Sequence, residues 1–283
     1  LRILDKERAA LDLGALGFDD ASSATLQRII DLPHGIVLVT GPTGSGKTTT
    51  LYALLSRLNS TERKILTIED PVEYQLDGIN QIQVKPQIGL DFPSALRSIV
   101  RQDPDVIMVG EMRDLETARI AVQSALTGHV VLSTLHTNDA GSSVTRLLDM
   151  GVEDYLVTSS LNAIVAQRLV RRLCDSCRRP FEPPQALVDQ LRLTPLAEGG
   201  PVALFAAHGC AACEGTGYRG RTVIAEVLVI SEAVRRAILE RTDGKELERL
   251  AIAEGMTNMK TNGLRKALAG ITTIEEVTRV TFA

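Results

Sequence analysis

The sequence predicts an α/β fold with a parallel β-sheet covered by helices, and two patterns between residues 35 and 172 indicate it. Short apolar runs rich in β-branched residues alternate with stretches that repeat apolar residues at three- and four-residue spacing. The runs are continuous rather than alternating with polar residues, which is typical of strands buried on both faces. We expect strands at Ile36–Thr40, Ile65–Ile68, Val106–Val109 and Val130–Ser133.

Helices are expected between and after these strands, where the helical periodicity lies. The expected helices are Lys47–Leu58, Ser94–Arg101, Leu115–Thr127, Ala140–Met150 and Tyr155–Leu173. A strand-like run follows at Thr222–Ile230, and the residues after it again have a helical pattern.

We expect four parts within the 283 residues. Residues 1–20 are interpreted as the remnant of a preceding domain with a linker, and residues 21–172 as the α/β core. Residues 173–221 contain all four cysteines and many prolines and glycines, so they are expected to form a small insert. Residues 222–283 are expected to form a return strand and a helical C-terminal subdomain. The sequence lacks an initiator Met, and we expect it to begin inside a longer protein.

Composition excludes several classes of protein. The net charge of −4 and the 3% aromatic content argue against a generally basic nucleic-acid binder and against a base-stacking platform. No apolar run approaches the ~20 residues of a membrane-spanning helix, and the first residues do not resemble a secretory signal. A cytosolic location is therefore expected, where cysteines more often bind metal or stay reduced than form disulfides.

A glycine-rich segment between the first strand and the first helix matches the phosphate-binding P-loop pattern. Its residues are Gly41, Pro42, Thr43, Gly44, Ser45, Gly46, Lys47, Thr48 and Thr49. In such a loop the glycines let backbone N–H groups surround the phosphates, and the helix N-terminus adds a positive dipole. Lys47 is expected to reach the β- and γ-phosphates and Thr48 to hold Mg²⁺. The pattern and its context predict a nucleoside triphosphate site.

Acidic residues follow two further strands and are candidates to hold Mg²⁺ through its water shell or to deprotonate an attacking water. Glu69, Asp70 and Glu73 follow the second strand, and their carboxylates are expected to face the crevice at the carboxyl end of the sheet. Glu111 follows the strand at Val106–Val109. The alternative is that these acids only solubilise strand ends.

His136 lies within Ser133–Asn138, which closes another strand with hydroxyl, amide and imidazole groups. Such groups can sense a γ-phosphate by hydrogen bonding, although a single histidine is more often structural.

Together these segments resemble the secretion ATPases of the type II secretion and type IV pilus superfamily. The matching segments are Gly41–Thr48, Glu69–Glu73, Arg101–Asp114 and Ser133–Asn138, which in that family are the Walker A, Asp box, Walker B and His box. Their order and spacing agree throughout residues 35–173. The resemblance implies a RecA-like P-loop NTPase fold with a tetracysteine zinc insert, and it implies ATP, Mg²⁺ and Zn²⁺ as cofactors.

The resemblance also implies roles for single residues. Lys47 and Thr48 correspond to the phosphate and Mg²⁺ ligands, and Glu73 to the general base. Glu111 corresponds to the Walker B glutamate that helps organise Mg²⁺ and water, and His136 to the residue that links nucleotide state to subunit motion. Three arginines in matching stretches can act on the phosphates or across a subunit interface, and they are Arg97, Arg101 and Arg113.

The four cysteines form two CxxC pairs, Cys174 with Cys177 and Cys210 with Cys213. Four thiolates from two tight turns match tetrahedral Zn²⁺ coordination with no open position, which predicts a structural metal rather than a catalytic one. The resemblance implies the same. Disulfides and unliganded thiols are the alternatives.

An arginine cluster surrounds the first cysteine pair. It consists of Arg168, Arg171, Arg172, Arg178 and Arg179. A solvated helix end is the simplest interpretation. Contact with an acidic partner, with anionic lipid or with nucleic acid are the alternatives.

The resemblance implies an ATP-hydrolysing motor, a hexameric homo-oligomer that powers pseudopilus assembly and protein export across the outer membrane in type II secretion. The tetracysteine insert favours the assembly-type ATPases. Segments Val144–Glu153 and Gly263–Thr272 look closest to the type II secretion branch, with type IV pilus assembly as a near neighbour.

The same resemblance implies a cytoplasmic protein, peripheral to the bacterial inner membrane. Its platform partners would be contacted mainly through the family's N-terminal region, with anionic lipid as a further partner and no nucleic acid. A DNA-transfer ATPase and a non-hydrolysing nucleotide-gated scaffold are the alternative functions.

Overall fold

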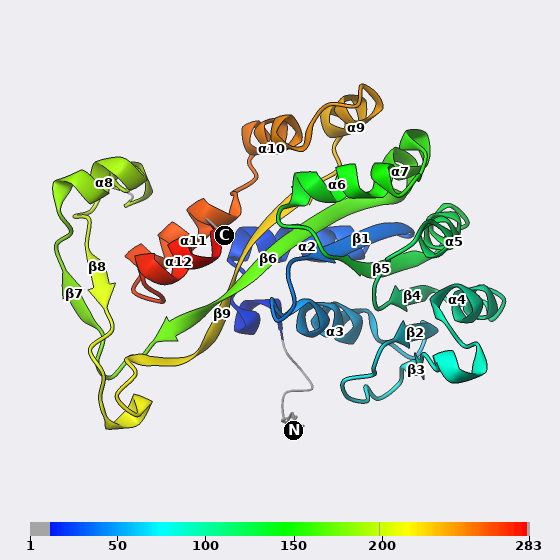
Figure 1. Ribbon diagram of the computed structural model, residues 1–283, viewed down its shortest axis with the longest axis horizontal. Coiled ribbons are helices and arrows are strands. Elements are labelled where there is room, and N and C mark those ends of the chain that lie inside the picture. Colours follow the sequence, from blue (N-terminus) through cyan, green and yellow to red (C-terminus); the bar gives the residue numbers. More distant parts are fainter. Residues whose placement is uncertain (1–11, 198, 282–283) are drawn as a thin grey trace. The chain divides into compact units, whose positions relative to one another are not determined.

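The computed structural model describes residues 12–197 and 199–281, and its largest sheet has seven strands in the order β3-β2-β4-β5-β1-β6-β9 (Figure 1). The strands are β1 (Gly35–Thr40), β2 (Ile65–Glu69), β3 (Asn80–Gln83), β4 (Val106–Val109), β5 (Val130–Leu135), β6 (Leu161–Leu173) and β9 (Tyr218–Val229). The pairs β1–β5, β1–β6, β2–β3, β2–β4 and β4–β5 are parallel. The predicted α/β fold with a parallel sheet and its four core strands are therefore confirmed.

Strand β9 runs antiparallel to β6 beside it. The backbone N–H of Ile230 donates to the carbonyl of Asn162 (3.0 Å), and that of Cys174 donates to the carbonyl of Gly217 (2.9 Å). The end of one strand thus lies beside the start of the other, which makes β9 the expected return strand.

The chain divides into two compact units. The first combines residues up to Ala166 with Val227–Met256, and the second combines Gln167–Glu226 with the residues from Thr257 onward. Strands β6 and β9 each contribute to both units. The four-part division expected from the sequence stays a prediction.

Most helices belong to the first unit. They are α1 (Leu13–Leu16), α2 (Asp20–Ile30), α3 (Lys47–Leu58), α4 (Phe92–Val100), α5 (Leu115–Leu126), α6 (Ala140–Asp149), α7 (Asp154–Ser160), α9 (Glu232–Leu239) and α10 (Gly244–Ala253), with the single-turn helix η2 (Pro86–Ile88). The predicted helices α3 to α6 are confirmed to within two residues at each end. Asp91, Asp114 and Asp139 start three of them, because each side chain accepts a hydrogen bond from the backbone N–H three residues later.

The predicted helix Tyr155–Leu173 is wrong over most of its length. Helix α7 ends at Ser160, and β6 begins at Leu161 and pairs with β1 as far as Thr40 opposite Ala166. The apolar residues of this segment fit a helical repeat and a buried strand equally well, so periodicity alone does not decide. Pairing with β1 does.

The start of the chain is only partly described. Residues 1–11 of the predicted remnant lie outside the described residues. Within the described part, Leu13 and Phe18 are buried at 3% and 5% exposure, so the segment around α1 packs into the first unit.

The second unit has an apolar core of its own. Its elements are β7 (Arg179–Phe181), β8 (Leu204–Ala206), α8 (Gln185–Leu191), α11 (Met259–Leu268) and α12 (Ile274–Thr281), with the single-turn helices η3 (Thr194–Leu196) and η4 (Ala211–Cys213). Strands β7 and β8 form an antiparallel pair. Val188, Leu204, Leu264 and Val277 bring α8, β8, α11 and α12 into one buried cluster.

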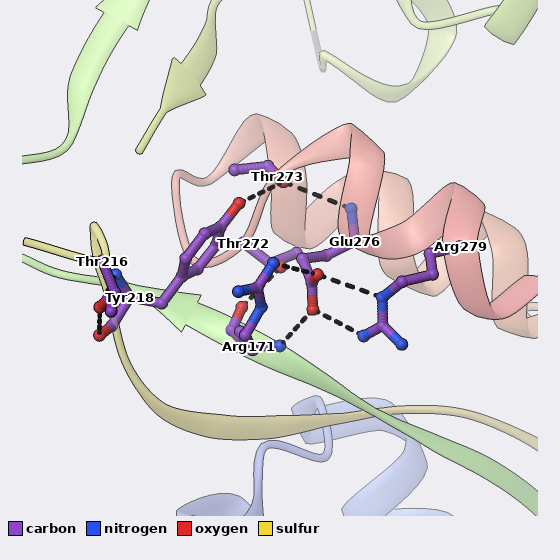
Figure 2. Close-up of polar contacts among 7 residues, drawn as sticks. All are labelled: Arg171, Thr216, Tyr218, Thr272, Thr273, Glu276 and Arg279. Carbon is purple, nitrogen blue, oxygen red and sulfur yellow. Dashed lines mark hydrogen bonds and ion pairs between the residues drawn. The ribbon is translucent and has the colours of Figure 1, made fainter. Parts of the chain in front are cut away.

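A buried carboxylate joins α12 to β6 within this unit (Figure 2). Glu276 accepts hydrogen bonds from the backbone N–H of Arg171 (2.9 Å) and from the guanidinium groups of Arg171 (2.8 Å) and Arg279 (2.8 Å). The Arg171 guanidinium also lies 4.0 Å from the ring centroid of Tyr218, whose hydroxyl hydrogen-bonds to Thr273 (3.2 Å). Burial alone would raise the pKa of Glu276, but the hydrogen bonds from Arg279 and Arg171 outweigh it and lower that pKa to about 2.

Candidate functional site

The segment after β1 has the backbone of a phosphate-binding loop. Gly41, Gly44 and Gly46 have φ angles of 148°, 81° and 89°, a region that side chains other than glycine rarely adopt. Gly46 is the N-cap of α3, so the loop runs directly into a helix N-terminus. Lys47 Nζ donates to the carbonyls of Gly41 (2.8 Å) and Pro42 (3.2 Å). The lysine side chain therefore folds back onto the first residues of the loop.

The other predicted site segments leave the same edge of the sheet. Strand ends are in register, with Thr40 opposite Leu135, Ile68 opposite Val109, and Val109 opposite Ser133. Because these strands are parallel, the segments that follow them emerge together at their carboxyl ends. Open α/β sheets bind ligands at this edge.

Glu111 and His136 are brought into contact. His136 Nε2 lies 3.2 Å from Glu111 Oε2, and the Arg113 guanidinium lies 2.6 Å from Glu111 Oε1. The Glu111 side chain is only 12% exposed, whereas those of His136 and Arg113 are 49% and 68% exposed. Hydrogen bonding to Glu111 raises the pKa of Arg113 above its usual value. The residues expected in the Walker B and His box segments, Glu111 and His136, are therefore in direct contact.

A chain of hydroxyl groups joins the end of β1 to helix α6. Thr40 Oγ1 accepts from the backbone N–H of Thr137 (3.0 Å), and the Thr137 hydroxyl hydrogen-bonds to the hydroxyls of Thr40 and Ser143. Thr137 is the neighbour of His136 and Thr40 precedes the P-loop. The two segments are therefore held to one another directly.

Glu69 departs from the expectation that all three carboxylates after β2 face the crevice. Its side chain is buried, at 3% exposure, and accepts hydrogen bonds from Tyr52, Thr67 and Gln81. Packing against α3 turns it inward. The backbone N–H of Glu73 donates to the Tyr52 hydroxyl (3.4 Å), which ties the Glu73 loop to α3.

Tyr52 and Gln81 were not expected at this site. The available signal was weak: Tyr52 lies five positions after Lys47 and is an aromatic residue with a polar tip in a helix whose other apolar residues are aliphatic. Gln81 lies on the edge strand β3, whose sequence has no apolar run that would predict a strand.

The four cysteine sulfurs gather in the second unit, all within 4.8 Å of one another. The Sγ–Sγ distances are 3.9 Å between Cys174 and Cys210, 3.8 Å between Cys177 and Cys213, and 3.7 Å between Cys210 and Cys213. A tetrahedral zinc with Zn–S bonds of about 2.3 Å needs sulfurs about 3.8 Å apart. The spacing fits that ion, and it excludes disulfide bonds between these free cysteines in this structure.

The sulfur of Cys213 accepts backbone hydrogen bonds that favour its negatively charged thiolate form. Burial would raise the pKa of Cys213, but backbone N–H groups of Cys210 and Gly217 donate to its sulfur, each at 3.2 Å. These hydrogen bonds, together with those from the neighbouring thiols of Cys210 and Cys177, lower the pKa of Cys213. A thiolate is the form that binds metal.

Three members of the arginine cluster have partners within the second unit, and one of them is Arg168, which donates to the carbonyl of Gln167 (3.2 Å). Arg171 pairs with Glu276, and Arg178 donates to the carbonyl of Gly270 (2.6 Å). Arg168 is buried at 8% exposure. These residues lie on and after strand β6, so the expected solvated helix end is wrong for the same reason as the predicted helix.

The chain belongs to the type II/IV secretion system protein family. The model of that family matches residues 1–279. Among the described residues, every helix is too short or too polar to cross a membrane.

Curated relatives agree with this assignment. Type II secretion system protein E of Xanthomonas campestris pv. campestris is 57% identical over 281 residues, which cover 99% of this chain and 49% of the relative. The type IV pilus assembly ATPase PilB of Myxococcus xanthus is 52% identical over 279 residues, covering 98% of this chain and 49% of the relative. The chain thus spans about half the length of these relatives.

A solved structure shares the fold. The pilus retraction motor PilT with bound ADP superposes with a TM-score of 0.72 at 29% identity, covering 99% of this chain and 68% of that one. The described fold is therefore shared with a pilus retraction motor.

Proposed function

We propose that this chain is the ATP-hydrolysing part of a type II secretion motor. One observation carries the proposal: the P-loop, the Glu73 loop, Glu111 and His136 leave one edge of the parallel sheet. Family membership supports it, and so do relatives whose names are type II secretion system protein E and PilB. PilT, which shares the fold, was solved with ADP.

The residues at this edge suit phosphoryl transfer, which depends on positioning and charge neutralisation. The N–H groups from Gly44 to Thr48 and the Lys47 ammonium would hold the β- and γ-phosphates, with Pro42, Thr43 and Thr49 completing the loop. Thr48, assisted by Glu111, would hold Mg²⁺, and this ion would neutralise charge on the phosphates. Glu73 would take the proton of the attacking water. His136, which contacts Glu111, would link the nucleotide state to subunit motion.

The proposal extends to the assembly. The chain would act within a homo-hexamer at the cytoplasmic face of the inner membrane, powering pseudopilus assembly for protein export. Platform proteins and anionic lipid are the proposed partners, and no nucleic acid is expected. Zn²⁺ held by the four cysteines would be structural, since four sulfur ligands leave no open position on a tetrahedral ion.

A second candidate is a type IV pilus assembly ATPase, favoured by the 52% identity to PilB. Both candidates share the ATP site and differ in the structure that the motor assembles, a pseudopilus in one case and a type IV pilus in the other. Restoring secretion, rather than pilus formation, to a strain that lacks its own motor separates them.

Hydrolysis itself is tested with two variants of the full-length protein. Lys47→Ala is expected to lose ATP turnover together with nucleotide affinity. Glu111→Gln is expected to bind a fluorescent ATP analogue normally but to lower kcat about 100-fold, because it removes a charge needed mainly in the transition state. Steady-state phosphate release and equilibrium binding measure the two effects.

Glu62→Gln, at an exposed turn, is the matched control and should leave both unchanged. Full turnover in Glu111→Gln would contradict the assigned role. Nucleotide binding with no hydrolysis in the wild type would favour the scaffold, and turnover that depends on DNA would favour a DNA-transfer ATPase.

A further inference from the structure

A buried polar cluster lies between α3 and strands β2 and β3 of the first unit. It consists of Tyr52, Thr67, Glu69 and Gln81, and we call it the Glu69 cluster. Tyr52, Thr67 and Glu69 are at most 3% exposed. The Glu69 carboxylate accepts from the Tyr52 hydroxyl, from Thr67 Oγ1 (2.7 Å) and from Gln81 Nε2 (3.0 Å). Three donors on a buried carboxylate make a rigid group, because losing any of them leaves buried polar atoms without a partner.

The same side chains hold the loop that follows β2. Gln81 Oε1 accepts from the backbone N–H of Leu76 (2.7 Å), and its Nε2 also lies 3.1 Å from the carbonyl of Tyr74. The Tyr52 hydroxyl accepts from the backbone N–H of Glu73 (3.4 Å). The rings of Tyr52 and Tyr74 meet edge to face with centroids 4.7 Å apart. The backbone from Glu73 to Leu76 thus rests on the cluster.

The hydrogen-bond inventory gives Tyr52 a defined orientation. A phenol has one proton to donate, and here it goes to Glu69. The oxygen remains free to accept from the N–H of Glu73, and Gln81 Nε2 lies 3.2 Å from it. Burial and the neighbouring Glu69 carboxylate raise the pKa of Tyr52, so the phenol keeps its proton. Tyr52 lies on α3, the helix that begins at Lys47.

We propose that Tyr52 is a positioning residue for ATP hydrolysis, which acts by fixing the Glu73 loop relative to the helix that carries Lys47. The inference rests on the proposed function, because it takes Glu73 as the base that accepts the proton of water. Tyr52 itself touches no reacting atom. Its effect passes through the Glu73 backbone and through Glu69.

Tyr52→Phe tests this in the assembled, full-length protein, because it removes the hydroxyl and keeps the ring. We expect kcat to fall about tenfold while KM for ATP and the affinity for a fluorescent ATP analogue stay unchanged, since a misplaced base slows chemistry without weakening phosphate binding. Tyr155→Phe makes the same chemical change at an exposed site and should behave as wild type.

A double-mutant cycle with Glu73→Gln separates positioning from general destabilisation. If Tyr52 acts through Glu73, adding Tyr52→Phe to Glu73→Gln causes no further loss of kcat. Amide hydrogen exchange gives a second readout: exchange at residues 73–76 should rise severalfold in Tyr52→Phe while the strands of the sheet keep their protection.

Three results would overturn the inference: an unchanged kcat in Tyr52→Phe, losses that multiply in the double variant, or exchange that rises across the whole sheet. Absence of Lys47-dependent turnover in the wild type overturns the proposed function, and this inference with it. Normal wild-type turnover with any of the three results overturns this inference alone.

Discussion

Glu276 and Glu69 are both buried carboxylates, but the groups that satisfy them differ in charge. Glu276 accepts hydrogen bonds from two arginines, whereas the donors to Glu69 named above are a phenol, a hydroxyl and an amide. Hydrogen bonds between two oppositely charged groups are the stronger kind, and they weaken when the carboxylate is protonated. The two residues therefore call for different tests, of stability for Glu276 and of catalysis for the Glu69 cluster.

Replacing Glu276 by Gln should destabilise the second unit by about 2 kcal/mol at neutral pH, because two charge-assisted hydrogen bonds are lost. The folded-state pKa of about 2 lies below the ordinary value of 4.5. A lowered carboxyl pKa contributes stability that is present above the unfolded-state pKa and is lost as the pH falls through the folded-state value. The difference in unfolding free energy between wild type and variant should thus shrink between about pH 4.5 and pH 2.

Denaturant unfolding followed across this pH range measures the effect. Glu275→Gln, one residue earlier on α12 and exposed, is the control and should change stability little at any pH. A difference for Glu276→Gln that stays constant down to pH 2 would show that the carboxylate charge is not what stabilises this contact.

At the scale of elements, the segments with strong local patterns were predicted well. Helix α3 has the predicted bounds, because the glycine-rich loop marks its start and its apolar face is continuous. Strand β6 was missed because Leu161–Ala166 is apolar except at Asn162, and the pairing with β1 that decides its structure is a long-range contact. Strand β3 was missed because it is a polar edge strand with mixed exposure.

The candidate site divides in the same way. Residues within a recognisable pattern, such as Lys47, Glu111 and Cys174, could be selected from the sequence. The contact between His136 and Glu111 follows only once β4 and β5 are known to be neighbours. Tyr52 and Gln81 belong to no pattern, and what selects them is burial around Glu69.

The cysteine knuckles are predicted to need metal for their structure. Cys174→Ser should lower the zinc content and the thermal stability of the second unit. Without the metal, the η4 turn and the Cys174–Cys177 turn hold thiolates close together, and little apolar packing around the sulfurs offsets their repulsion. Loss of ATP turnover would follow as a secondary effect. Elemental analysis and calorimetry measure the two properties.

Ser176→Ala changes an exposed residue inside the same turn and should leave both properties intact. A Cys174→Ser protein with full zinc content and unchanged melting would refute the structural zinc proposal.

At the scale of the molecule, the proposed motor depends on assembly. The chain spans about half the length of the curated relatives it matches. Two polar side chains at the site, those of Arg113 and His136, are partly exposed, and we propose that a neighbouring subunit contacts them. A site completed between subunits makes turnover depend on protein concentration.

The most direct test of the central claim is steady-state ATP hydrolysis measured against protein concentration, with Lys47→Ala as the blank. The account predicts that specific activity rises with concentration and reaches a plateau, while the Lys47→Ala protein stays silent throughout. Activity at the blank level at every concentration, in the full-length protein, would contradict the claim that this sheet edge hydrolyses ATP.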